Sequence, residues 1–125
     1  MMPVLVIHGG AGQLAKICQA EGLEAPYREA LRAALFYGGK ALERSSVDAV
    51  VEAIKVLEDS PLFNAGQSSV FNSMGEIEMD ASLMDGKSLE AGGVYALKTI
   101  KNPISAARSV MDLSKHTLLG EDAVL

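Results

Sequence analysis

The chain has 125 residues, of which 49% are apolar, and its formal net charge is −5. An acidic chain without a basic run does not match the phosphates of a nucleic acid, so we expect no nucleic-acid partner. Its apolar runs are far shorter than the roughly 20 residues that cross a bilayer, and we expect no membrane segment. The single cysteine, Cys18, excludes an internal disulfide and indicates a reducing, cytoplasmic location.

The first part of the chain predicts one strand and one helix. Val4 to Ile7 is a short apolar run that ends at two glycines, which indicates a buried strand followed by a loop. Residues 13–25 show no clear period and are expected to be loop. From Pro26 to about Glu43, apolar side chains recur every three or four residues, as they do in a helix. Gly38-Gly39 weakens this helix, and we expect close packing against a sheet as the compensation.

A second helix follows Ser45, because Ser45-Ser46-Val47-Asp48 loosely matches a capping box. Its apolar stripe runs to Leu57, and Pro61 requires that it has ended by Ser60. Residues 63–74 are rich in serine, asparagine and glycine, which is typical of a structured loop.

The second part of the chain predicts a hairpin and a third helix. Apolar and polar residues alternate over 77–83, Asp85-Gly86 is a turn signal, and residues 92–100 supply the partner strand. Asn102-Pro103 then opens a helix. The order strand, helix, helix, strand, strand, helix predicts an α/β (α+β) fold. We expect residues 1–125 to form a single partial domain whose sheet has open edges.

Two segments are candidates for a functional site. His8-Gly9-Gly10 follows the predicted strand, and it is either a simple turn or a place where backbone N–H groups approach a ligand. Residues 57–67 combine acidic side chains with an irregular backbone. They are either a helix end with solvated acids or a cage of carbonyl oxygens for a hard cation such as Na⁺ or Ca²⁺.

Other reactive side chains receive structural interpretations. Asp80 is expected to be a buried, hydrogen-bonded carboxylate, Asp85 a turn residue and His116 a surface or helix-end histidine. Cys18 lies in a segment without a His or Asn partner, so a thiol nucleophile is not expected. Four methionines are expected to fill the core: Met74, Met79, Met84 and Met111.

Two motifs, Phe63-Asn64-Ala65-Gly66 and the stretch from Glu78 to Gly86, carry a family resemblance, together with His8-Gly9-Gly10-Ala11-Gly12. The chain resembles the plant-type asparaginase / isoaspartyl peptidase family of N-terminal-nucleophile hydrolases. The resemblance implies a four-layer αββα sandwich of which this chain supplies about half. It also implies a precursor that cuts itself, and a threonine nucleophile at the start of a second, β piece. The expected assembly is a dimer of αβ heterodimers that hydrolyses β-aspartyl dipeptides and the side-chain amide of L-asparagine.

The resemblance places no catalytic residue in this chain and implies no catalytic cofactor. It implies active-site support from His8, Gly9, Gly10 and Asn64, the last beside the nucleophile. It further implies a structural Na⁺ held by the main-chain carbonyls of Leu57, Glu58, Ser60, Phe63, Ala65 and Gln67. Ser68 departs from the family, which usually has glycine there, and would strain the loop if the position requires a positive φ.

Three alternatives remain open. The only threonines, Thr99 and Thr117, lie outside any junction that resembles the cleavage site, which favours a non-catalytic remnant acting as a scaffold. The sister enzyme glycosylasparaginase is disfavoured by the lone cysteine and by the absence of a secretory signal. Threonine aspartase is a weaker sister candidate.

Overall fold

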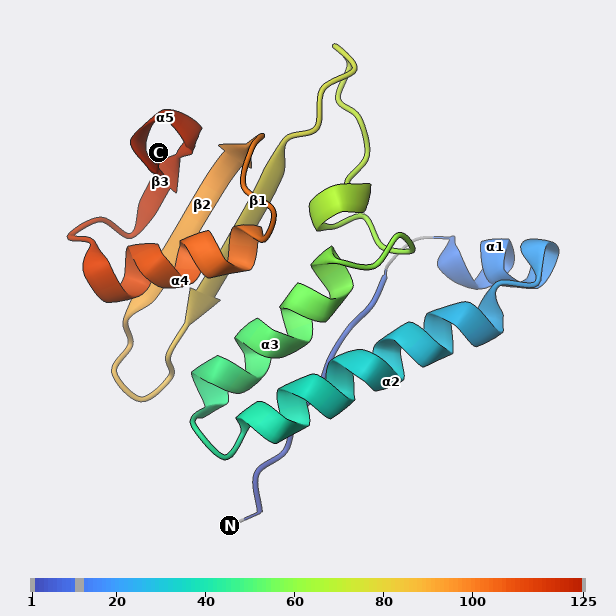
Figure 1. Ribbon diagram of the computed structural model, residues 1–125, viewed down its shortest axis with the longest axis horizontal. Coiled ribbons are helices and arrows are strands. Elements are labelled where there is room, and N and C mark those ends of the chain that lie inside the picture. The colour runs from blue at the N-terminus through green and yellow to red at the C-terminus, as the bar shows by residue number, and fades with distance from the viewer. Residues whose placement is uncertain (1, 11–12, 125) are drawn as a thin grey trace.

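Helices occupy the first half of the chain and a small sheet lies in the second half (Figure 1). The structure is a computed structural model, and it describes residues 2–10 and 13–124. Its elements are α1 (Leu14–Glu21), α2 (Glu24–Ala41), α3 (Ser46–Glu58), the 3₁₀ turn η1 (Gly66–Ser68), β1 (Met79–Met84), β2 (Ala91–Leu97), α4 (Pro103–Leu113), β3 (Leu118–Gly120) and α5 (Glu121–Val124). The mixed helix-and-strand class is therefore confirmed.

The segment Val4–Ile7 is extended, but it is not the buried strand that the sequence predicted. No backbone ladder joins it to another strand within the described residues. Val4 and Val6 are each 82% exposed, whereas Leu5 and Ile7 are half-buried. The segment crosses α2 and α3 on one side only (Figure 1). Because the helices cover a single face, only alternate side chains are sheltered.

Helix α1 corrects the prediction of a loop over residues 13–25. It ends at Gly22, whose φ of 66° is left-handed and whose N–H donates to the carbonyl of Cys18. Its N-cap, Gln13, makes no side-chain capping hydrogen bond. Cys18 is buried on this helix and not in a loop. With only eight residues and no capping side chain at its N-terminus, α1 carries few local sequence signals besides the glycine at its C-terminus.

Helices α2 and α3 pack closely because Gly38 has no side chain. A β-carbon added at Gly38 would lie 2.9 Å from the β-carbon of Ala53 and 2.7 Å from Leu5. The predicted close approach is therefore to α3 and the extended segment and not to a sheet. At Gly39, no atom of the described residues lies within 4 Å of an added β-carbon, so this glycine has no packing role.

The predicted capping serine begins α3. The Ser45 hydroxyl accepts a hydrogen bond from the N–H of Asp48 at 2.9 Å. The Asp48 carboxylate pairs instead with Arg108 of α4, 3.1 Å away. Hydrogen bonding to Ser45 and the positive charge of Arg108 hold the pKa of Asp48 below its ordinary value. This pair joins the helical half of the chain to the sheet half.

The sheet has the order β1-β2-β3. Strands β1 and β2 form the predicted antiparallel hairpin, and β3, which the sequence did not predict, pairs parallel with β2. The register shifts between Met79 and Ala81, opposite Ala96, whose φ is 56°. The N–H of Ala96 donates to Asp80 Oδ1 at 2.9 Å. Asp80 is thus hydrogen-bonded as predicted, but it is exposed and not buried.

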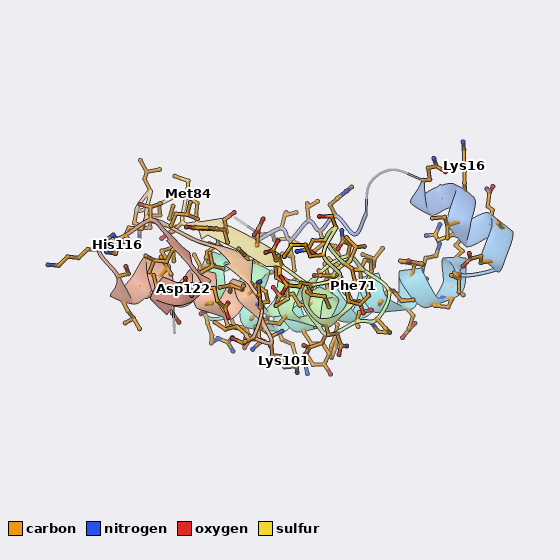
Figure 2. The ribbon with its side chains drawn as sticks, turned by 90° about the horizontal axis from the view of Figure 1, so that it is seen from above. Lys16, Phe71, Met84, Lys101, His116 and Asp122 are labelled. Carbon is orange, nitrogen blue, oxygen red and sulfur yellow. The ribbon has the colours of Figure 1, made fainter. Side chains whose placement is uncertain are left out.

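The sheet is covered by α4 on one face and open on the other. A β-carbon added at Gly92 would lie 2.7 Å from the β-carbon of Met111, which shows how closely α4 approaches β2. On the open face, Met84, Tyr95 and Leu118 are 57%, 51% and 59% exposed. Figure 2 shows Met84 on the broad face along which the extended segment runs, and Lys101 on the opposite face.

The core lies between α3, α4 and the hairpin, and its buried members include Val51, Met79, Leu83, Val94, Leu97 and Ile104. Only part of the methionine prediction is confirmed. Met79 is buried and Met111 packs against the core, whereas Met74 and Met84 are exposed. In the part of the chain that the structure describes, no helix is long and apolar enough to cross a membrane.

Candidate functional site

The end of α3 and the loop that follows it, together residues 57–67, are held in place from α2. Tyr27 donates a hydrogen bond from its hydroxyl to the carbonyl of Leu62 at 2.7 Å. The Tyr27 ring also meets the Phe63 ring edge-on, with centroids 5.4 Å apart. Phe63 is buried, so the middle of the loop is anchored to the helical layer.

Gly66 folds the second half of this loop back onto its start. Its φ is 57°, in the left-handed region, and an added β-carbon would lie 2.7 Å from the β-carbon and 2.8 Å from the carbonyl carbon of Glu58. No other residue type could approach the end of α3 this closely without displacing backbone. The peptide groups at the two ends of the loop are therefore brought together.

The predicted sodium ligands are carbonyls of this folded loop. Three of them accept short-range hydrogen bonds: Leu57 from Ser60, Phe63 from Ala65, and Ala65 from Ser68. A carbonyl oxygen has two lone pairs, so such a bond leaves room for a cation. Neutral oxygen ligands on an irregular backbone fit the chemistry of Na⁺. Among the described residues, no cluster of three His, Cys, Asp or Glu side chains could hold a metal, and the carbonyl site stays a prediction.

Asn64 projects from the loop between two hollows. Its Oδ1 accepts a hydrogen bond from the N–H of Val70 at 2.9 Å, which fixes the orientation of the amide. One hollow, of about 540 Å³, is lined by Asn64 together with Gly9 and Gly10. The other, of about 420 Å³, is lined by Asn64 together with Asp80 and Ser82 of β1. An exposed amide at this position can donate to and accept from a group on either side.

The His-Gly-Gly segment meets the loop through its glycines. A β-carbon added at Gly9 would lie 3.0 Å from the Phe63 ring, and Gly10 has a φ of 140°. His8, in contrast, is exposed and lines a separate groove with Val50 and Leu57. The structure therefore brings Gly9, Gly10 and Asn64 to one hollow, and it places His8 beside that hollow and not in its lining.

Glu58 is a feature that the sequence analysis missed. Its side chain is 3% exposed, and its two oxygens accept hydrogen bonds from the N–H of Ile104 at 2.9 Å and from Asn102 Nδ2 at 3.0 Å. Burial raises the pKa of the Glu58 carboxyl, while these hydrogen bonds oppose the shift. The interpretation of this loop as a helix end with solvated acids is therefore wrong at Glu58.

Asp59, the next residue, does face solvent. Asn102 Nδ2 donates to it at 3.0 Å, and this hydrogen bond, together with Lys101, holds the pKa of Asp59 below its ordinary value.

Ser68 imposes no strain on the loop. Among the described non-glycine residues, positive φ occurs at Leu89 and Ala96 and not at Ser68. The expected cost of serine at this position does not arise.

Comparison with known proteins decides the family. The family model described as "Asparaginase" matches residues 1–124. The chain belongs to the asparaginase family. The resemblance carried by the Asn64 and Asp80 motifs is confirmed.

Asparaginase-family relatives are similar along almost the whole chain. The chain is 50% identical over 125 residues to a plant-type L-asparaginase of Pyrococcus abyssi, a match covering 98% of this chain and 40% of that protein. It is 48% identical over 121 residues to the isoaspartyl peptidase/L-asparaginase of Xenopus laevis and, equally, to that of Homo sapiens, each match covering 95% of this chain and 38% of the relative. The chain therefore spans about two fifths of the length of these relatives.

Proposed function

We propose that this chain is the α portion of an isoaspartyl peptidase / L-asparaginase. The proposed enzyme hydrolyses β-aspartyl dipeptides and the side-chain amide of L-asparagine through a threonine nucleophile that a second, β piece supplies. The observation that carries the proposal is the match to relatives with these names over 95–98% of this chain but over only about two fifths of each relative.

The site supports this assignment through Asn64. Its amide lies between the glycines of the His-Gly-Gly segment and strand β1, and the Val70 N–H fixes its orientation. In the proposed reaction the threonine hydroxyl attacks the substrate carbonyl and its own amine takes the proton. The C–N bond then breaks, and water releases the aspartyl group. Asn64 would orient the threonine hydroxyl, which is a task for a rigid amide.

The loop over residues 57–67 would serve this role by holding Asn64 still. We propose that the carbonyls of Leu57, Glu58, Ser60, Phe63, Ala65 and Gln67 hold a Na⁺ ion. Such an ion would supply a fixed positive charge that rigidifies the loop. The approach of Gly66 to Glu58, which joins the two ends of the loop, supports this proposal.

The open face of the sheet supports the proposed partner. Met84, Tyr95 and Leu118 are exposed there, and Val4 and Val6 are exposed along the unpaired extended segment. A second piece that adds strands would cover both surfaces and complete a four-layer αββα sandwich. We propose that two such αβ units form a cytoplasmic heterotetramer.

The test is made on the assembled protein, meaning this chain produced together with a matching second piece that begins with threonine. We expect a soluble complex that releases ammonia from L-asparagine and leucine from β-Asp-Leu. A matched second piece with the first threonine replaced by alanine should assemble equally well and hydrolyse neither substrate. An assembled protein without either activity would refute the proposed function.

A scaffold role without catalysis is the second candidate. In this candidate, the two threonines of the chain serve the structure alone. The Thr99 hydroxyl is hydrogen-bonded to Glu121 at 2.8 Å, and the Thr117 carbonyl accepts from Gly93 at 2.7 Å. Intact-mass measurement of the protein from its natural source separates the candidates, because only the enzyme requires a second chain with an N-terminal threonine.

A further inference from the structure

The N-terminus of α4 is capped by a residue from another helix. Asn102 stands at the N-cap position but makes no side-chain capping hydrogen bond, and Pro103 has no N–H to donate. The first free N–H, that of Ile104, donates to Glu58 Oε1 at 2.9 Å. A carboxylate at this end of a helix is favoured by the helix dipole as well as by the hydrogen bond. Glu58 therefore takes the place of the missing local cap.

Asn102 reinforces the same connection. Its Nδ2 donates to Glu58 Oε2 and to Asp59 Oδ1, each at 3.0 Å. The side chain that would ordinarily cap α4 thus binds the last residues of α3 instead. Both oxygens of the buried Glu58 carboxylate have a donor from the start of α4, which a buried charge requires.

Glu58 also contacts the loop that carries Asn64. Gly66 packs directly on the Glu58 backbone, and the Gln67 side chain donates to the carbonyl of Asp59. The loop is therefore fastened to the end of α3 by its backbone, and the end of α3 is fastened to α4 by the Glu58 side chain. Because α4 packs on β1 and β2, the connection continues into the sheet.

The hollow of about 420 Å³ lies along this connection. It is lined by Asn64 from the loop, by Asp80 and Ser82 from β1, and by Glu58 and Ile104. The distance between the two walls of this hollow, the loop that carries Asn64 and strand β1, is thus set where Glu58 meets α4. A change at that point would move Asn64 relative to β1 without touching either of them.

We propose that Glu58 is a positioning residue whose buried carboxylate, by capping α4, fixes Asn64 relative to strand β1. This inference rests on the proposed function in one respect, namely that Asn64 acts on the reacting threonine. The carboxylate is needed for its two acceptor oxygens and not for direct contact with substrate. An isosteric amide would keep the shape but turn one acceptor into a donor facing Asn102.

The first test compares Glu58→Gln with Glu52→Gln in the assembled protein. The control changes the same chemical group on the same helix, where Glu52 forms surface ion pairs with Lys55 and Arg44. For Glu58→Gln we expect kcat for β-Asp-Leu to fall at least tenfold with KM within threefold. We expect exchange of the Val70 amide hydrogen, which reports the bond to Asn64, to accelerate at least tenfold. Both quantities should stay within twofold for Glu52→Gln.

The second test reverses the hydrogen bonds. In the triple variant Glu58→Gln, Asp59→Asn and Asn102→Asp, the carboxylate at position 102 accepts from the amides at positions 58 and 59. The donors and acceptors among these three side chains thus change place, while the N–H of Ile104 still donates to the side chain at position 58. We expect recovery of most of the lost kcat and of the Val70 protection. A merely space-filling role predicts no such recovery.

Three results would overturn the inference: equal effects of Glu58→Gln and Glu52→Gln, loss of kcat without faster Val70 exchange, or no recovery in the triple variant. If the unsubstituted assembly hydrolyses neither substrate, the proposed function fails. The Val70 exchange rates then still decide whether Glu58 positions Asn64.

Discussion

Replacing Gly66 with alanine should damage the loop in two separable ways. Alanine at a φ of 57° costs about 1–2 kcal/mol, because its β-carbon crowds the following carbonyl. The same β-carbon would lie 2.7 Å from that of Glu58 and 2.8 Å from the Glu58 carbonyl carbon, so backbone must move. Overpacking of this kind costs about 1–3 kcal/mol. We therefore expect Gly66→Ala to lower the free energy of unfolding by about 2–5 kcal/mol.

Gly75 provides the matched control. Its φ is 78°, also left-handed, but no atom of the described residues lies within 4 Å of an added β-carbon. Gly75→Ala should therefore cost only the backbone term, about 1–2 kcal/mol. The difference between the two variants isolates the contact between Gly66 and the end of α3. Urea unfolding of the assembled protein, followed by circular dichroism, measures both values.

The two variants should also differ in their response to Na⁺. If the loop carbonyls hold the ion, replacing Na⁺ by choline should lower the stability of the native protein and of Gly75→Ala, but have little effect on Gly66→Ala. Equal destabilisation by the two substitutions would refute the packing contribution of Gly66. An unchanged Na⁺ response in Gly66→Ala would refute the joining of the loop ends as the basis of ion binding.

Three further predictions concern the activity of the isolated chain, the side-chain amide of Asn64 and the carboxylate of Asp48. The purified 125-residue chain alone should show no hydrolysis of L-asparagine in an ammonia-release assay. In the assembled protein, Asn64→Ala should lower kcat at least tenfold while leaving Na⁺-dependent stability intact, and full activity would contradict its assigned role. Asp48→Asn should cost about 1 kcal/mol at pH 7, measured by urea unfolding. Because the folded pKa of Asp48 lies below the unfolded value of about 4, this cost should begin to shrink as pH falls below about 4 and should disappear as pH falls through the folded pKa. A cost that is independent of pH would exclude the charge as its origin.

Sequence patterns predicted the elements that carry their own local signals. The hairpin follows from strict alternation over residues 77–83, and α3 follows from its serine cap and its apolar stripe. By contrast, α1 has eight residues and no capping side chain, and β3 has three residues, which pair with β2 and pack against the core through Leu119. Elements this short exist through tertiary contacts, which a single sequence does not display.

The candidate site also combines residues that the sequence indicated with a residue that only the structure revealed. Family motifs predicted a role for Asn64, Gly9 and Gly10, and the structure places these three residues around one hollow, while their role stays a prediction. The motifs did not reveal Glu58, because a glutamate at the end of a helix is usually solvated. One signal was present: Val51, Ile54 and Glu58 lie three or four residues apart and so share the buried face of α3. What the periodicity could not supply was the partner, since the N–H of Ile104 is 46 residues away in sequence.

The alternating exposure of the extended segment restricts how a strand could add to it. Leu5 and Ile7 are sheltered against the helices, while Val4 and Val6 point outward. A partner strand that slipped by one residue would present the wrong set of side chains to each side. Only slips of two residues, about 7 Å, preserve the facing. Helices α2 and α3 therefore determine which side chains of the extended segment face outward, and so which registers a partner strand can adopt, before any partner binds.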